Sequence, residues 1–295
     1  MRSACIDIGS NTTRLLVGEP AGGGLREVLS RRMFVPLLDG GNGAIDPETV
    51  AVVAEVVAAH AAVARDSGAA RVHVVATAAI RAAANRDELC SAVARDAGLP
   101  VRVLSDDEEA RLAFAGVTGT LAEPPAGPVG VVDVGGGSSE LVVGTVAEGM
   151  SWYVSLPVGS GLLTRRHVRG DPPAESELRA LRAEAQAAFA RVDAPPAACV
   201  YAVGGSATSL RRLCGDELTP RTLQAALGVL ARWPVRDAAR RLSLARERVR
   251  LLPAGLILLG AASAAFGGAS LGVARGGLRE GVLLEDFAGR DRVVE

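Results

Sequence analysis

The chain has 295 residues, enough for one large domain or two modest ones. Hydrophobic residues make up 49% and the formal net charge is −1, which excludes a disordered chain and gives no global sign of a nucleic-acid or membrane-surface protein. The chain contains no lysine, so all 32 Lys-or-Arg residues are arginine. Every such cation is therefore a planar guanidinium that can bind phosphate through two hydrogen bonds.

The sequence has neither a signal-peptide pattern nor the cysteine spacing of a zinc site. Asp7 interrupts the first apolar run, which is unlike a signal peptide. The most apolar stretch, residues 251–265, contains Pro253 and two glycines and is too short to span a bilayer. The four cysteines lack zinc-site spacing, so we expect small, reduced core residues. These features predict a soluble cytoplasmic protein with no membrane or nucleic-acid partner.

The first half of the chain alternates strands and helices. Residues 5–18 form an apolar strand, a small-residue turn and a second apolar strand, with Asp7 at the end of the first. Val and Ala then recur at helical spacing over 47–68, after Asp46-Pro47-Glu48 as N-cap and first turn. The pattern continues with a strand, a helix, a strand and a helix capped by Ser105 or Asp106, at 72–76, 85–98, 101–104 and 106–116.

The second half repeats this order. Residues 131–144 align with 5–18 over fourteen positions without a gap, so that Asp133 matches Asp7 and Glu140 stands where the first copy has Arg14. A strand, a helix, a second strand and three helical patterns follow, at 152–156, 176–192, 199–203 and between 220 and 265.

This duplication predicts the fold class: α/β, with two domains related by an approximate twofold. The Pro-rich stretch 122–128 is the natural boundary, giving an N-terminal domain at 1–122 and a C-terminal domain at 123–295. We expect the ligand to bind in the cleft between the two domains.

The small-residue turns have the chemistry of phosphate sites. Glycine lets the backbone approach closely, and successive N–H groups can converge on an anion. A single such turn often serves only to close a hairpin, but the duplication favours a functional role, and a third glycine turn opens a helix after residue 203. The candidate substrate-binding residues are Gly9, Ser10, Asn11, Gly135, Gly136, Gly137, Ser138, Gly204, Gly205 and Ser206.

Asp7 and Asp133 lie among apolar strand residues, where a carboxylate is costly unless it is paired or metal-bound. Either could simply brace its own turn. The alternative is a divalent cation with oxygen ligands, which is expected wherever a phosphoanhydride is cleaved. Because Glu140 replaces Arg14 at the equivalent position, the second hairpin is predicted to complete a Mg²⁺ or Mn²⁺ site, with Asp133, Glu140 and Asp7 as candidate ligands.

Several motifs together resemble the exopolyphosphatase/guanosine pentaphosphate phosphohydrolase family, in its short two-domain form. The resemblance rests on the three turns and on the stretches 76–85, 104–112 and 171–173, and it runs in order over nearly the whole chain. It implies an actin-like, ribonuclease H-like fold of the actin–sugar kinase–Hsp70 type in both domains. It also implies that Glu109 is the catalytic base, Asp133 and Glu140 are metal ligands, and Arg81 binds substrate phosphate. Without the resemblance, Glu109 reads as an ordinary exposed helix charge.

One departure concerns the segment after the second hairpin. Where the family pattern has an arginine, this chain has Leu162, and Arg165 or Arg166 could supply the cation instead. Substrate affinity and chain-length preference are the properties that this change affects.

Taken together, these features predict an enzyme that releases orthophosphate from the end of inorganic polyphosphate and/or guanosine pentaphosphate. One alternative is a kinase or ATPase of the same fold. Another is a regulator that binds guanosine penta- or tetraphosphate without hydrolysing it. We expect a homodimer, although the sequence fixes neither the oligomer, the metal nor the preferred substrate.

Overall fold

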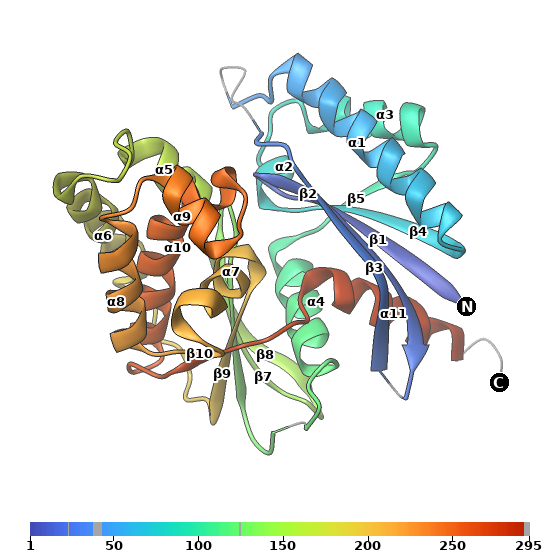
Figure 1. Ribbon diagram of the computed structural model, residues 1–295. Coiled ribbons are helices and arrows are strands. Elements are labelled where there is room, and N and C mark those ends of the chain that lie inside the picture. Colours follow the sequence, from blue (N-terminus) through green and yellow to red (C-terminus); the bar gives the residue numbers. More distant parts are fainter. Residues whose placement is uncertain (23, 38–42, 124, 292–295) are drawn as a thin grey trace. The chain divides into compact units, whose positions relative to one another are not determined.

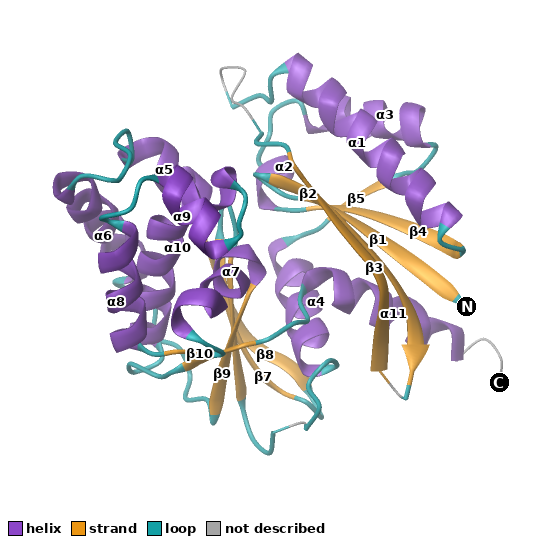
Figure 2. Ribbon diagram, in the orientation of Figure 1, coloured by secondary structure: helices purple, strands orange, loops and turns teal. Residues whose placement is uncertain are grey.

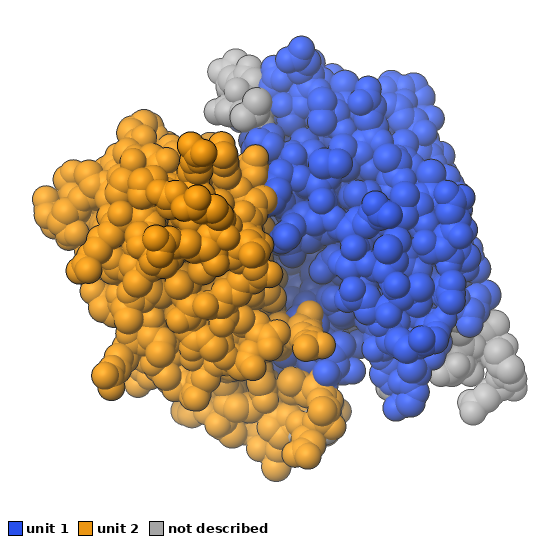
Figure 3. Space-filling model, in the orientation of Figure 1, with its two compact units in different colours: residues 1–120, 276–295 blue, residues 121–275 orange. Residues whose placement is uncertain are grey.

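The structure is a computed structural model that describes residues 1–22, 24–37, 43–123 and 125–291. Strands and helices alternate along the chain (Figures 1 and 2). The chain divides into two compact units, coloured separately in Figure 3: unit 1 comprises residues 1–120 and 276–295, and unit 2 comprises residues 121–275.

Unit 1 is built on a five-stranded sheet of order β3-β2-β1-β4-β5. The first three strands pair antiparallel as a meander, and β1, β4 and β5 run parallel. The strands are β1 (Arg2–Ile8), β2 (Thr12–Ala21), β3 (Gly24–Phe34), β4 (Ala69–Ala76) and β5 (Val101–Val103). The helices are α1 (Pro47–Asp66), α2 (Ala78–Arg81), α3 (Arg86–Ala97), α4 (Asp106–Thr118) and α11 (Leu278–Asp291).

The two faces of this sheet bury different cores. Ala4, Ile6 and Ile8 of β1 pack with α1 and α3, whereas Cys5 packs with α4 and α11. Because successive side chains of a strand point to opposite faces, Asp7 belongs to the face that α4 and α11 cover. The sequence pattern therefore directs the one carboxylate of β1 away from the larger apolar core.

Unit 2 ends at residue 275, before the end of the predicted C-terminal domain 123–295. Residues 276–295, which include α11, belong to unit 1. The apolar side chains Val282, Leu283 and Phe287 of α11 share a core with Cys5 of β1. The backbones of α4 and α11 also approach closely, and a Cβ atom on Gly281 would fall directly on the Leu112 carbonyl. Glycine is therefore required for this helix pair. The N-terminal boundary of unit 2 lies next to the predicted linker.

Unit 2 contains a six-stranded sheet of order β10-β11-β9-β6-β7-β8. Its strands are β6 (Val129–Val134), β7 (Ser139–Thr145), β8 (Gly149–Leu156), β9 (Cys199–Val203), β10 (Glu217–Leu218) and β11 (Leu271–Val273). Its helices are α5 (Ser160–His167), α6 (Glu175–Phe189), α7 (Gly204–Cys214), α8 (Pro220–Leu230), α9 (Val235–Leu242) and α10 (Arg246–Ala265). One continuous core joins these helices to Val132 and Val134 of β6.

The strand order confirms the predicted duplication. Strands β3-β2-β1-β4 of unit 1 correspond to β8-β7-β6-β9 of unit 2, with the same directions. Asp7 pairs with Arg14 across β1 and β2, and Asp133 pairs with Glu140 across β6 and β7, in the same register. The prediction of two actin-like α/β domains is confirmed, whereas the cleft between them stays a prediction.

Two helices of the described chain, α1 and α10, are 20 residues long and apolar enough to cross a membrane by length and composition. Of their most apolar windows, 44% and 67% of the residues are buried inside the protein. The buried residues of both helices, such as Val53 and Leu258, belong to the hydrophobic cores of their units. Core helices of soluble proteins pass the same test of length and composition.

Candidate active site

The first glycine turn is closed by its own backbone. The Gly9 N–H donates to the Thr12 carbonyl at 3.0 Å, while the carbonyls of Ser10 and Asn11 accept from Leu37 and Val35. The Gly9 N–H is therefore not available to a ligand. Glycine at this position allows the close approach to Thr12, since a Cβ atom there would lie 3.3 Å from the Thr12 oxygen. The Ser10 N–H makes no backbone hydrogen bond within the described part of the chain, and it is available to an anion.

The second glycine turn repeats this geometry. The Gly135 N–H donates to the Ser138 carbonyl, again at 3.0 Å. The N–H groups of Gly136 and Gly137 make no backbone hydrogen bond to any described residue. In each turn the N–H of the first glycine is thus already used within the turn, and Ser138 of the second turn is buried.

The first turn of α5 fixes the second glycine turn from behind. Both the N–H and the hydroxyl of Ser160 donate to the Gly135 carbonyl, at 2.9 and 3.0 Å. The Leu162 N–H donates to the Gly136 carbonyl at 2.9 Å. Leu162 therefore positions the turn through its backbone, while Arg165 and Arg166 lie near the other end of the same helix.

Asp7 occupies a cationic environment in unit 1. Burial raises the pKa of Asp7, and the positive charges of Arg14 and Arg279 partly oppose this rise. Its Oδ1 atom is buried and accepts no hydrogen bond from the described residues. Because two guanidinium groups already act on it, Asp7 is a weaker fit to a metal than the other predicted carboxylates.

Asp133 and Glu140 form the carboxylate pair of unit 2. They lie opposite each other on antiparallel strands, so both side chains project to the same face of the sheet. Glu140 is buried, with 3% exposure, and its Oε1 accepts a hydrogen bond from the Ser155 hydroxyl at 3.1 Å. Two hard oxygen donors on one sheet face suit a divalent cation such as Mg²⁺.

No cluster of three or more His, Cys, Asp or Glu side chains forms a metal site among the described residues. This is compatible with Mg²⁺, which is commonly held by one or two carboxylates together with water and substrate phosphates. The donor set of Asp133 and Glu140 therefore fits the predicted ion.

The third glycine turn lies directly against Asp133. Gly204 has φ of +82°, and a Cβ atom there would lie 2.5 Å from Asp133 Oδ1. Ser206 is fully buried, and its hydroxyl faces Gly255 of α10. Of the predicted residues Gly204, Gly205 and Ser206, the last can offer an anion only its backbone N–H at the start of α7.

In unit 1, the structure brings Glu109 and Arg81 together. Arg81 follows β4, and its Nη1 donates to Glu109 Oε2 at 3.2 Å and to the Leu104 carbonyl at 2.6 Å. Arg81 also pairs with Asp106. Glu109 is 12% exposed, so a guanidinium holds a largely buried carboxylate in one orientation.

The neighbouring Glu108 has a structural role. It forms a capping box with Ser105, the N-cap of α4, and its Oε1 accepts from Arg102 at 2.5 Å. These contacts lower the pKa of Glu108 to about 2, chiefly through Arg102. The two adjacent glutamates therefore point to different partners, and Ser105 settles the cap that the sequence left open.

Two arginines near the candidate site were not predicted. Arg279 of α11 acts on Asp7, and Arg248 of α10 is 4% exposed with its guanidinium against Gly205. The run Gly276-Gly277-Leu278-Arg279-Glu280-Gly281 could have signalled the first, because two charges among glycines are unusual in an apolar helix start. Arg248 lies in an arginine-rich segment where nothing in the sequence sets it apart.

A duplicated actin-like fold, with open N–H groups in paired glycine turns and with carboxylates beside them, defines a protein that handles phosphate groups. Comparison with known proteins supports this class. A model of the Ppx/GppA phosphatase family matches residues 19–288, and the chain belongs to this family. The resemblance stated from the motifs is thereby confirmed.

Individual relatives cover nearly the whole chain. Exopolyphosphatase 1 of Mycobacterium leprae is 29% identical over 304 residues, which is 96% of this chain and 89% of the relative. The guanosine-5'-triphosphate,3'-diphosphate pyrophosphatase of Aeromonas hydrophila is 29% identical over 99% of this chain and 62% of its own length. The crystal structure of the Aquifex aeolicus Ppx/GppA family member has a TM-score of 0.81 and 28% identity over 98% of both chains.

Proposed function

We propose that this protein hydrolyses the terminal phosphoanhydride bond of inorganic polyphosphate and/or guanosine pentaphosphate and releases orthophosphate. The observation that carries the proposal is the Arg81–Glu109 pair, which orients a largely buried carboxylate in a chain with two phosphate-type turns. The names of the Mycobacterium and Aeromonas relatives support the two substrate classes.

In this mechanism the substrate is held by backbone groups. The N–H groups of Ser10, Gly136 and Gly137 bind terminal phosphates without bringing a full positive charge to them. The first N–H groups of α7 add a helix N-terminus.

A Mg²⁺ or Mn²⁺ ion held by Asp133 and Glu140 would neutralise charge on the transferring phosphoryl group. Glu140 is oriented for this role by the Ser155 hydroxyl. Gly204 leaves the space that the Asp133 carboxylate occupies.

Glu109 orients the attacking water. Its hydrogen bond from Arg81 fixes the orientation of the carboxylate, which can accept a hydrogen bond from a water molecule. Phosphoryl transfer through a loose transition state needs positioning more than full deprotonation of the nucleophile. Arg81, the cation of this pair, is the candidate contact to substrate phosphate.

Adjacent substitutions test the assignment. Glu109→Gln is expected to lower phosphate release by roughly 10²- to 10⁴-fold, the usual contribution of such a group, while substrate binding persists. Glu108→Gln removes the same charge one residue away and should leave turnover within about twofold, because Glu108 contacts the helix cap. Phosphate release from polyphosphate and guanosine pentaphosphate should be measured in parallel. Normal turnover in the Glu109 variant refutes the role of Glu109.

The alternatives are distinguished in the same assay. A kinase or ATPase of this fold would form ADP from ATP with an acceptor and would release no phosphate from polyphosphate. A guanosine penta- or tetraphosphate sensor would bind tightly at saturating Mg²⁺ and release nothing. The Glu109–Arg81 geometry favours an enzyme over the sensor, because turnover uses an oriented carboxylate and binding alone does not. We further propose a cytoplasmic homodimer, to be checked by fractionation and light scattering.

A further inference from the structure

Residues 232–250 carry an unusual surplus of positive charge. This segment contains seven arginines and two carboxylates, Asp237 and Glu247, in a chain whose net charge is −1. It covers α9 and the first turn of α10, and only Arg248 among its arginines is buried. We call the exposed members on these two helices the arginine track; they are Arg236, Arg240, Arg241, Arg246 and Arg250.

The spacing of the track concentrates its charge. Arg236 and Arg240 are four residues apart on α9, and Arg246 and Arg250 are four residues apart on α10, so each pair shares one helix face. Like charges at this spacing destabilise a helix. The one ion pair of the track joins Arg240 to Asp237 at 3.4 Å. No carboxylate of a described residue lies within 4.0 Å of the other four guanidinium groups.

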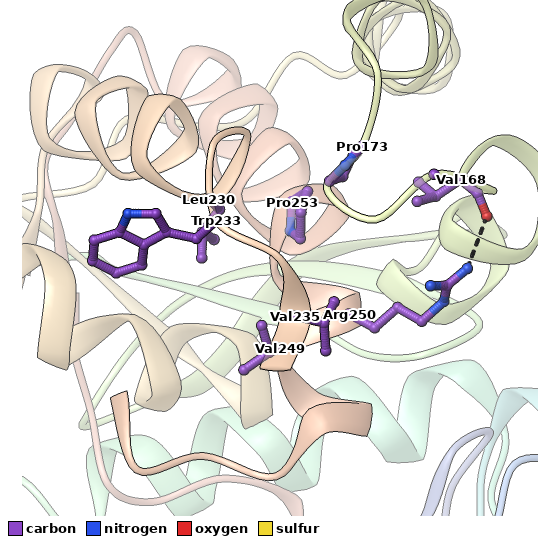
Figure 4. Close-up of a pocket in the computed structure, with 9 residues that line it drawn as sticks. Val168, Pro173, Leu230, Trp233, Val235, Val249, Arg250 and Pro253 are labelled. Carbon is purple, nitrogen blue, oxygen red and sulfur yellow. Dashed lines mark hydrogen bonds between the residues drawn. The ribbon is translucent and has the colours of Figure 1, made fainter. Parts of the chain in front are cut away.

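The helices of the track contact elements that begin at the glycine turns of unit 2. On the buried face of α10, opposite to Arg246 and Arg250, lies Arg248, and a Cβ atom on Gly205 would lie 2.5 Å from its Nη2. On the other side, Arg250 Nη2 donates to the Val168 carbonyl at 3.3 Å, just after α5, as Figure 4 shows. Helix α5 begins at the Gly135–Gly136 turn, and α7 begins at Gly204. Helix α10 therefore contacts two elements that each start at a glycine turn, with Arg250 near the far end of α5.

The pocket in Figure 4, which lies beside the track, does not have the polar lining of a phosphate-binding cavity. Its lining is apolar apart from Arg250, whose guanidinium is directed to the Val168 carbonyl. Trp233, the one aromatic residue of segment 232–250, carries the Arg241 guanidinium over its ring at 4.7 Å. The ring face is therefore occupied by a cation, and no second aromatic residue of the segment offers a base-stacking platform, which single-stranded nucleic acids favour.

We propose that the arginine track binds the phosphates of a linear inorganic polyphosphate chain whose end is held at the glycine turns. This inference rests on the proposed hydrolytic function, and it adds a preference for long chains. Each phosphate brings a negative charge that replaces the missing carboxylate partners, and planar guanidinium groups bind it in two-pronged fashion. Binding of this kind releases counterions and weakens steeply with salt.

The test removes two track charges that have no ion-pair partner among the described residues. Arg236→Gln/Arg246→Gln is compared with Arg179→Gln/Arg191→Gln, which removes two exposed arginines from the same unit outside the track. The track variant should raise KM for long-chain polyphosphate roughly 3- to 10-fold and reduce the slope of log KM against log salt by about 1 to 2. Its kcat, and its KM for tripolyphosphate, should match those of the control. Equal KM values for the long chain in both variants overturn the proposal.

Two further measurements separate the possible failures. If the wild-type protein releases no phosphate from tripolyphosphate, guanosine pentaphosphate or long-chain polyphosphate, the proposed hydrolysis is wrong. Direct binding of long-chain polyphosphate to wild-type and variant proteins then tests the track alone, and equal binding overturns it. A single-stranded oligonucleotide of matched charge serves as competitor. If the track substitutions weaken oligonucleotide binding and leave polyphosphate binding unchanged, the surface is a nucleic-acid site and the proposal fails.

Discussion

The contact between Gly204 and Asp133 gives a sharp prediction about the candidate metal site. Gly204 combines φ of +82° with a carboxylate oxygen 2.5 Å from the position of a Cβ atom. Gly215, at the other end of α7, has nearly the same φ of +81° but no atom within 4 Å of its Cβ position. Substituting alanine at each position therefore separates backbone strain from displacement of the carboxylate.

Both variants should lose stability by a similar amount. A non-glycine residue held in this backbone region costs on the order of 1–3 kcal/mol. In Gly204→Ala, the Asp133 oxygen must also move by about 1 Å to reach an ordinary carbon–oxygen separation. A displacement of that size in a catalytic constellation costs on the order of 10²-fold in rate. Gly215→Ala lies about 16 Å away along the helix and should keep its activity.

The assay is phosphate release from polyphosphate at saturating Mg²⁺, together with thermal unfolding of both variants. The expected outcome is a shared fall in Tm and an activity loss confined to Gly204→Ala, accompanied by a higher Mg²⁺ requirement. Equal activities in the two variants would show that Asp133 does not depend on the space left by Gly204. Equal losses would show that strain in α7, rather than the carboxylate, controls turnover.

Two stability predictions concern α4 and α11. Glu108→Gln should lower the free energy of unfolding by about 0.2–1 kcal/mol at neutral pH, because it removes a partly exposed ion pair with Arg102 while the amide oxygen can still accept in the capping box. Since the folded pKa of Glu108 is lowered to about 2, this stabilisation is present above pH 4.5 and should fade as pH falls toward 2 in unfolding titrations. Gly281→Ala should destabilise the protein by about 1–3 kcal/mol or more in denaturant unfolding, because its Cβ meets the Leu112 carbonyl. The Cβ atom of Gly289→Ala, in the same helix, meets no atom within 4 Å, so this control variant should be as stable as the wild type or more stable. If Gly281→Ala is as stable as Gly289→Ala, the close crossing of α4 and α11 is contradicted.

Sequence patterns predicted the fold well because the duplication fixes many elements at once. Two hairpins of the same length, each followed by alternating helices and strands, specify the same strand order twice. Local signals also located helix starts, as with the Asp46 side chain, which accepts from the Thr49 N–H at 3.1 Å. Such features depend on residues close in the chain, which a sequence shows directly.

The sheet against which α11 packs could not be predicted in this way. Its amphipathic pattern predicts an apolar partner but does not show which sheet provides it. The partner is β1, more than 270 positions away in the chain. The hydrogen bond from the Ser3 hydroxyl to Asp286 joins the same two elements. The roles of Glu108 and Glu109 posed a similar difficulty. Adjacent helix positions point about 100° apart, and only the placement of Arg81 and Arg102 determines which carboxylate faces which partner.

The duplication is most informative where its two copies differ. In each unit an aspartate ends the first strand of a glycine-turn hairpin, and the residue opposite it on the next strand shares its sheet face. In unit 1 that residue is Arg14, whose positive charge, with that of Arg279, partly opposes the rise that burial causes in the pKa of Asp7. In unit 2 it is Glu140, so two carboxylates share a face and their repulsion favours an added divalent cation. One substitution within a repeated hairpin thus places a cation opposite the aspartate in the first copy and a second carboxylate opposite it in the second copy, where the candidate metal site lies.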